Sequence, residues 1–434
     1  MNKKKIMLVT LTLLVSIMMF GLSATATAAA TRWVNNNKPT GTPPGTSCDN
    51  PGYKQIQDAV NASAPGDLIN VCAGTYPEQV SVLAGKDNLT LRSVTPLAAI
   101  IQAPPTIGAD VVNFKSIVRI TTSHNVTLLA FTITGPGPFG CDSIRYGVRV
   151  DGGGSANILN NHITEIRDTP FSGCQNGVAI LVGRQFESQT GSAVILGNLI
   201  DKYQKNGPTV DNFGSSAVIA GNTIIGAGAT PITAQNGIQI SRGASAEVRQ
   251  NRVRDNAYIV PLHLPEFTAA GILLYQAGTV VTDRNELRRN QDGIDLITLP
   301  VGNATVSNNT VIGGIPPFNP ALGTLTLGDG IFADTDTANN RIRRNFLRDN
   351  REHDCHDDSV GPNNPPALVA NIWRDNNGLT ENRPGLCRER GDNDDNDRDG
   401  DHDRGNDDRN VGNSNGKQIS TQAAVSRPRA NPID

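Results

Sequence analysis

The sequence predicts an all-β fold, a parallel β-helix in which short strands wind into a solenoid around one continuous core, with a short capping helix at the N-terminal end. Composition favours this fold, because the 434-residue chain has only 4% aromatic residues but 44 glycines and 26 prolines, which suits many turns. A repeat favours it as well, because two motifs alternate between Asn161 and Asn345. The shortest repeats span 24 residues, as from Asn198 to Asn222, which suits a coil of two or three short strands.

Residues 1–30 read as a secretory signal peptide. Three lysines, Lys3 to Lys5, precede an apolar run from Ile6 to Leu22 and a stretch of small residues that ends at Ala30. An uncleaved anchor is the alternative, although the run is short for a membrane span. No later stretch resembles a transmembrane segment, so we expect a secreted protein, extracellular or in the cell envelope.

Residues 31–66 are predicted to form the N-terminal cap. Within Tyr53–Asn61, Ile56 and Val60 have helical spacing, and Pro65-Gly66 follows, so this segment predicts a short amphipathic helix over the open end of the core. The first strands are expected in three segments, which are Asp67–Val71, Val80–Leu83 and Leu89–Leu91.

The first repeated motif is apolar-x-x-x-Asn-x-apolar. An asparagine buried at a recurring corner can hydrogen-bond to the backbone and to its counterpart one coil away. The coils would then stack about 4.8 Å apart, as strands in a sheet do. The motif occurs at Asn161, Asn198, Asn222, Asn251, Asn285, Asn309 and Asn345.

The second motif is a glycine followed by apolar-x-apolar, which predicts a strand with alternate residues facing inward. We expect the glycine to supply a positive φ at a tight corner. A β-propeller is the competing fold, but its blades need about 40–45 residues, and here each segment is one strand long. The residues before the glycine are Tyr146, Asn176, Asn206, Asn236, Ala270, Asp292 and Asp329.

The β-helix domain is predicted to span residues 31–390, with residues 346–390 as a C-terminal cap. Residues 391–434 begin with an Asp-, Asn- and Arg-rich stretch without apolar residues, so this tail is expected to be disordered. Asp395-x-Asp397-x-Asp399-Gly400 matches half of a Ca²⁺-binding loop, but Asn406 stands where such a loop needs glutamate.

The six cysteines suit an exported protein. They allow 15 pairings, and loop-closure entropy favours near neighbours along the chain. A zinc site is the alternative, but the chain has no Cys-x-x-Cys. The predicted disulfides are Cys48–Cys72, Cys141–Cys174 and Cys355–Cys387.

The stretch YKQIQDAVNASAPGDLINVCAGTYPEQVSV, with the coils behind it, resembles the right-handed parallel β-helix proteins of the pectin-lyase-like group. Its helix and Gly-Asp-x-Ile-x-Val pattern are similar to the opening of pectin methylesterases and of many secreted bacterial β-helix-repeat proteins. The resemblance covers about Trp33 to Cys387 and implies a right-handed solenoid. It implies no particular reaction, because the fold carries lyases, hydrolases, epimerases, esterases and proteins without known chemistry. The motifs of pectin methylesterases, alginate epimerases and polygalacturonases are absent, so no catalytic residue can be carried over.

Long insertions fall almost entirely between an asparagine motif and the next glycine motif, so we expect the long loops to emerge along one edge of the solenoid. These loops carry aromatic residues, whose ring faces beside a groove would suit a sugar chain. The alternative is that the aromatic residues pack the loops onto the wall of the solenoid. An extracellular polysaccharide is therefore the expected partner, and we expect a monomer. The net charge of −3 excludes a generic nucleic-acid surface. The candidate substrate-binding residues are Tyr146, Arg149, Gln239, Tyr258, His263 and Phe267.

Three carboxylates are the candidate catalytic residues. Asp292 and Asp329 should lie on adjacent coils, with Asp295 three residues along. Neighbouring acids raise one another's pKa, and an acid pair is what glycosidic-bond chemistry needs. Two alternatives stay open: the carboxylates could hold Ca²⁺, the one cofactor to consider, or aspartate could replace asparagine in the turn.

The segment Glu352–Asp358 concentrates potential ligands and proton carriers. His353, His356 and Asp357 are the candidate metal ligands, because a turn could bring them together. The alternative is a polar C-terminal cap that the third disulfide ties down and Trp373 covers.

Three functions follow from these patterns. The leading hypothesis is a protein that binds an extracellular polysaccharide, with cleavage or epimerisation by a lyase, glycoside hydrolase or epimerase mechanism as its extension. The second is a non-catalytic structural or adhesive surface protein. The third resembles the periplasmic copper-delivery β-helix proteins and would use His353 and His356.

Overall fold

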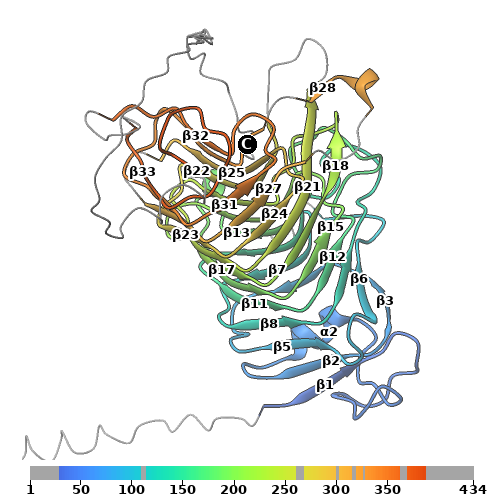
Figure 1. Ribbon diagram of the computed structural model, residues 1–434. Coiled ribbons are helices and arrows are strands. Elements are labelled where there is room, and N and C mark those ends of the chain that lie inside the picture. The colour runs from blue at the N-terminus through green and yellow to red at the C-terminus, as the bar shows by residue number, and fades with distance from the viewer. Residues whose placement is uncertain are drawn as a thin grey trace, which may run out of the picture.

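The computed structural model describes residues 29–108, 114–260, 268–299, 303–314, 319–325, 328–361 and 369–387. Their strands form three parallel sheets that wind into one long solenoid, from β1 at one end to β33 near the other (Figure 1). The predicted all-β parallel β-helix is confirmed. Apart from residues 29 and 30, the predicted signal peptide lies outside the described residues, as does the whole predicted tail.

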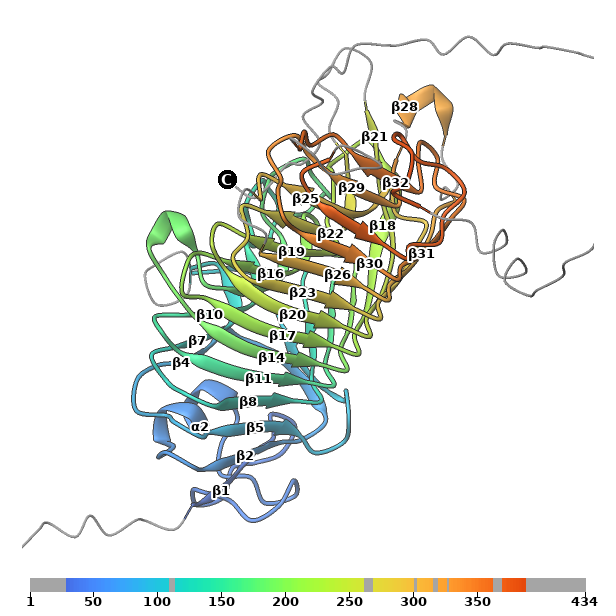
Figure 2. The ribbon, with the colours of Figure 1, turned by 60° about the vertical axis from the view of Figure 1, so that its left-hand side comes forward.

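From β2 (Leu68–Val71) onward the chain passes through the three sheets in the same order, as in β11 (Ser155–Leu159), β12 (His162–Thr164) and β13 (Val178–Val182). Figure 2 shows successive coils stacked along the axis. Within the described residues, the twelve-stranded sheet contains β1 (Thr31–Val34), β2 (Leu68–Val71), β5 (Thr90–Ser93), β8 (Val126–Leu129), β11 (Ser155–Leu159), β14 (Ser192–Leu196), β17 (Ser216–Ala220), β20 (Ser245–Arg249), β23 (Val280–Asp283), β26 (Ala304–Ser307), β30 (Arg341–Arg343) and β33 (Ile372–Arg374). The eleven-stranded sheet contains β3 (Gly74–Pro77), β6 (Ala99–Gln102), β9 (Thr132–Thr134), β12 (His162–Thr164), β15 (Leu199–Asp201), β18 (Thr223–Thr230), β21 (Arg252–Val260), β24 (Glu286–Arg288), β27 (Thr310–Ile312), β31 (Phe346–Arg348) and the antiparallel β28 (Thr324–Leu325). The ten-stranded sheet contains β4 (Val80–Val82), β7 (Ser116–Thr121), β10 (Tyr146–Asp151), β13 (Val178–Val182), β16 (Asn206–Asp211), β19 (Ile238–Ser241), β22 (Ala270–Tyr275), β25 (Asp292–Ile297), β29 (Ile331–Ala333) and β32 (Cys355–Asp357). The helical elements are α2 (Ile56–Ala62), η1 (Gln185–Glu187) and η2 (Pro320–Leu322).

The asparagines of the first motif form a continuous buried ladder at the corner between the twelve- and eleven-stranded sheets. Asn222 is typical: its Nδ2 donates to Ile195 O and to Asn251 Oδ1, both at 2.9 Å, and its Oδ1 accepts from the backbone N–H of Asn198 at 2.9 Å. The predicted contact between counterparts one coil apart is thus confirmed. The ladder also includes Asn376, which the motif did not predict.

The expected reason for the glycine motif was wrong. Of the column Gly147, Gly177, Gly207, Gly237, Gly271, Gly293 and Gly330, only Gly177 has a positive φ. The others are required because there is no room for a side chain: a Cβ on Gly207, for example, would lie 2.2 Å from Gly237 O in the next coil. The positive φ values fall instead on the residue before each ladder asparagine, as at Gln250 and Arg284.

Helix α2 covers the N-terminal end of the core, as predicted. Its buried Ile56, Ala59 and Val60 join the same apolar cluster as the first strands. Glu78 caps the start of the helix: its two carboxylate oxygens accept the backbone N–H groups of Ile56 and Gln57, each at 2.9 Å. A side chain from the first coil therefore holds the cap in place.

This helix contact makes part of the stability depend on pH. Burial raises the pKa of the Glu78 carboxyl above its ordinary value of 4.5, although the two backbone donors oppose the shift. The folded state then holds the proton more tightly than the unfolded state, so stability falls as pH rises from 4.5 towards the folded-state pKa. We expect Glu78→Gln to lack this part of the pH dependence of the urea midpoint, whereas the exposed Glu247→Gln should keep it. A Glu78→Gln profile parallel to that of the wild type would contradict the assignment.

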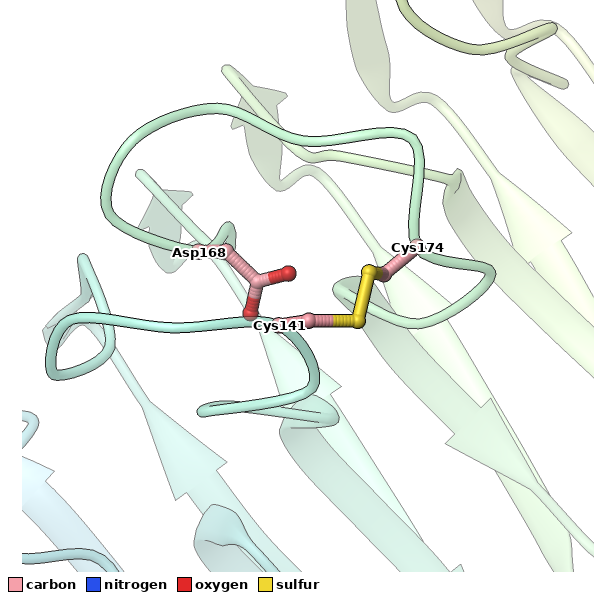
Figure 3. A group of neighbouring side chains, drawn as sticks. All are labelled: Cys141, Asp168 and Cys174. Carbon is pink, nitrogen blue, oxygen red and sulfur yellow. A yellow bond between two sulfur atoms is a disulfide. The ribbon is translucent and has the colours of Figure 1, made fainter.

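The long connections run from the eleven-stranded to the ten-stranded sheet, as predicted. Examples are the segments between β9 and β10 and between β12 and β13. The disulfide Cys141–Cys174 joins these two loops, and buried Asp168 lies beside it (Figure 3). Asp168 accepts hydrogen bonds from the backbone of Ser143 in one loop and from the side chain of Ser172 in the other. The disulfide and these hydrogen bonds therefore hold the two loops together.

All three predicted disulfides are confirmed: Cys48–Cys72, Cys141–Cys174 and Cys355–Cys387. The coils continue into the predicted C-terminal cap, because β31, β32 and β33 each extend one of the sheets. In the described part of the chain, no helix is long and apolar enough to cross a membrane.

Candidate functional site

The ten-stranded sheet aligns polar side chains on its outward face. In β10, Val148 and Val150 belong to the core, so Arg149 between them faces outward. Parallel register carries this outward position from coil to coil. The column reads Arg119, Arg149, Leu181, Thr209, Gln239, Leu273, Asp295, Phe332 and His356, and every member is buried.

The candidate catalytic acids and the candidate metal-binding histidines meet at the C-terminal end of this face. Asp329 Oδ2 lies 3.0 Å from His356 Nδ1, and Asp329 Oδ1 lies 3.6 Å from His353 Nδ1. The backbone N–H of His353 donates to Asp329 Oδ1 at 3.0 Å. The sequence predicted two separate sites, but the structure makes them one.

A second carboxylate lies on the far side of His356. Asp358 Oδ1 is 2.9 Å from His356 Nε2, so the imidazole stands between two acids. Burial alone would lower the pKa of His356, but the neighbouring Asp329 and Asp358 outweigh it and raise that pKa to about 9. We call Asp329, His353, His356 and Asp358 the Asp–His cluster. Its rim is accessible, because the side chains of His353 and Asp358 are 28% and 24% exposed.

Asp292 and Asp295 lie on the neighbouring coil, in β25. The predicted proximity of Asp292 and Asp329 is confirmed, since the backbone N–H of Asp329 donates to Asp292 Oδ1 at 2.8 Å. Asp295 lies between Leu273 and Phe332 of the adjacent strands, and the Phe332 ring packs edge-on to the His356 ring at 5.1 Å. The acids of three successive coils thus approach one another.

Asp357 does not join the cluster. Alternation along β32 turns it away from His356, and it accepts hydrogen bonds from Ser359, Asn371 and the Trp373 indole. Burial raises the pKa of its carboxyl. Asp357 therefore fits the alternative of a polar C-terminal cap and not the predicted metal-ligand role. Asp358 is the carboxylate beside His356.

Arg149 and Tyr146, predicted to bind substrate, are committed to internal contacts. Arg149 Nε lies 2.5 Å from Asp151 Oδ2, and its guanidinium also pairs with Glu187. The same guanidinium stacks over the rings of Phe114 and Tyr146, at 4.2 and 5.2 Å. The Arg149 guanidinium is therefore engaged in internal contacts of the ten-stranded sheet and is not a free cation for a substrate.

The remaining predicted binding residues divide in two. Gln239 is buried and accepts a hydrogen bond from Asn206 Nδ2 at 2.7 Å, and Tyr258 of β21 packs in a small apolar cluster. Both fit the wall-packing alternative. His263 and Phe267 lie outside the described residues.

A hollow that neither motif predicted lies along the twelve-stranded sheet. It has a volume of about 520 Å³. Its signal in the sequence is a Ser-Ala pair that opens successive strands. These pairs are Ser155-Ala156, Ser192-Ala193, Ser216-Ala217 and Ser245-Ala246.

The family model for the right-handed β-helix region matches residues 116–364. Solved structures are similar as well, and three of them are described by their identity, coverage and TM-score. XylC in complex with xylose is 11% identical over 80% of this chain and 70% of that one, with a TM-score of 0.47. Pectate lyase Pel9A is 14% identical, with coverage of 65% and 80% and a TM-score of 0.45. The GH136 lacto-N-biosidase from Eubacterium ramulus is 14% identical, with coverage of 83% and 66% and a TM-score of 0.48.

No curated protein matches the chain.

Proposed function

From the premise that this chain belongs to the family of right-handed β-helix proteins, we propose that it is a secreted or cell-envelope protein that binds an extracellular polysaccharide and cleaves or epimerises it. The reaction centre is the Asp–His cluster with Asp292 and Asp295. One observation carries this proposal: acids and a histidine from three successive coils converge on one end of the outward face. Buried ionisable groups with an accessible rim are typical of reaction centres.

The arrangement suits proton transfer at a sugar ring. His356 lies between Asp329 and Asp358, with a carboxylate oxygen 3.0 Å from Nδ1 and another 2.9 Å from Nε2. Asp295 lies one coil away from Phe332, whose ring backs His356. A general acid and a general base on neighbouring coils are what glycosidic cleavage or epimerisation needs. The three disulfides support the extracellular assignment, because such bonds persist in oxidising compartments.

The test is turnover on a panel of acidic and neutral polysaccharides, followed by reducing ends and by absorbance at about 235 nm for unsaturated products. We expect Asp295→Asn to lower the rate by about 100-fold or more, as loss of a general acid or base does. Asp201→Asn is the matched control, because Asp201 also pairs with a histidine, His162, at 3.2 Å but on the eleven-stranded sheet. Its rate should stay at the wild-type value.

Two outcomes would overturn the catalytic assignment. One is equal turnover by Asp295→Asn and the wild type. The other is polysaccharide binding without any product, which would favour the non-catalytic adhesive function instead.

A further inference from the structure

We propose that Asp329, His353 and His356 bind one divalent transition-metal ion of the zinc class, with Asp358 as the carboxylate that orients His356. The candidate ligand atoms, one from each residue, all lie within 4.8 Å of one another. They come from two successive coils: Asp329 precedes β29, whereas His353 precedes β32 and His356 lies within it. This inference does not depend on the polysaccharide assignment.

The two distances from Asp329 to the histidines suit a single ion. Zinc binds imidazole nitrogen and carboxylate oxygen at about 2.0–2.2 Å, which separates two ligand atoms by roughly 3–3.6 Å. The separation is 3.0 Å between Asp329 Oδ2 and His356 Nδ1, and 3.6 Å between Asp329 Oδ1 and His353 Nδ1. The two imidazole rings stand edge to face, 4.9 Å apart, so they do not stack in a way that closes the space.

The facing atoms also suit a cation. Within the described part of the chain, the Nδ1 atoms of His353 and His356 are buried and make no hydrogen bond of good geometry, although each faces an Asp329 oxygen. As a metal ligand, His356 is a neutral imidazole that donates its Nε2–H to Asp358 and presents a lone pair at Nδ1. A lone pair and a carboxylate repel each other unless a cation lies between them. A proton on His356 would satisfy one facing pair, whereas a single metal ion satisfies both.

Asp358 lies where a carboxylate commonly supports a metal-bound histidine, beside the ring nitrogen that does not bind the metal. A histidine ligand usually donates its other ring N–H to a carboxylate, which fixes the ring and strengthens the ligand. Asp358 Oδ1 lies 2.9 Å from His356 Nε2 and supplies this contact. Asp329 is held in turn by the backbone N–H of His353.

The donor set selects the class of metal. Two imidazoles and a carboxylate suit zinc and its neighbours in the transition series, whereas Ca²⁺ takes six to eight oxygens. The proposed ion is therefore not the Ca²⁺ that the sequence suggested as an alternative for Asp292, Asp295 and Asp329. Three protein ligands leave a coordination position open for water or substrate, as in catalytic rather than structural zinc sites.

The experiment is calorimetric titration of the chelator-treated full chain with Zn²⁺, without polysaccharide. We expect one site per chain, and we expect visible d–d bands of tetrahedral intensity when Co²⁺ replaces Zn²⁺. His353→Ala should abolish this site and should cost little stability, because its Nδ1 makes no hydrogen bond. Asp358→Asn should weaken Zn²⁺ binding by about 10–100-fold. His162→Ala, which removes another histidine with an aspartate partner, should bind Zn²⁺ like the wild type.

Wild-type affinity in His353→Ala, absence of a Zn²⁺ site in the wild type, or binding of Ca²⁺ in place of Zn²⁺ would each overturn the proposal. A failure of polysaccharide turnover with Zn²⁺ binding intact would overturn only the proposed function. Thermal midpoints of the metal-free variants separate loss of the site from loss of the fold.

Discussion

Replacement of Asn222 by alanine is expected to lower the free energy of unfolding by about 4 kcal/mol, because it leaves several buried polar groups without partners. The side chain is buried and donates to Ile195 O and Asn251 Oδ1, while its own oxygen accepts two hydrogen bonds from Asn198. At a close-packed corner, water cannot easily take the place of these partners. The measurement is the urea midpoint followed by circular dichroism.

Asn157→Ala is the matched control for this change. Asn157 lies on the outward side of the twelve-stranded sheet, half-buried, and donates to Asn125 at 2.7 Å. We expect a loss within about 1 kcal/mol, because surface amides exchange protein partners for water. Equal losses in the two variants would show that the ladder is not a principal source of stability.

Gly207→Ala is expected to cost about 3 kcal/mol through overpacking. Its Cβ would lie 2.2 Å from Gly237 O and 3.1 Å from the Ile224 side chain, so neighbouring coils would have to separate. Separation at this point would also disturb the register that aligns the outward column. The thermal midpoint and the urea midpoint measure the effect.

Gly85→Ala distinguishes the two explanations for glycine. Gly85 has a φ of +81°, and among the described residues no atom beyond its chain neighbours lies within 4 Å of the position that a Cβ would take. Only backbone strain therefore opposes the change, and the expected cost is about 1 kcal/mol. A larger loss of unfolding free energy for Gly85→Ala than for Gly207→Ala would show that positive φ, and not lack of space, is the main reason for glycine.

The repeat, the capping helix and the disulfides could be predicted because each depends on spacing along the chain. The ladder asparagines recur at one corner, and each cysteine pairs with its nearest neighbour in sequence. These features need no knowledge of which side chains meet across the solenoid.

The site was harder to predict because it depends on the phase of alternation and on contacts between coils. Asp357 and Asp358 are adjacent in sequence, yet alternation sends one towards Trp373 and leaves the other beside His356. The sequence could not fix that phase, because it did not show where β32 begins. The pairing of Arg149 with Asp151 was missed, although the two residues lie two positions apart in β10 and therefore share its outward face.

Neighbouring coils join the acids and histidines into one centre, and this central claim can be tested directly. The measurement is a crystal structure of the Zn²⁺-loaded protein with an anomalous difference map at the zinc absorption edge. We expect one peak about 2.0–2.2 Å from ligand atoms of Asp329, His353 and His356, with Asp358 behind His356. A map that places the peak elsewhere, or that separates Asp329 from His356, would contradict the claim.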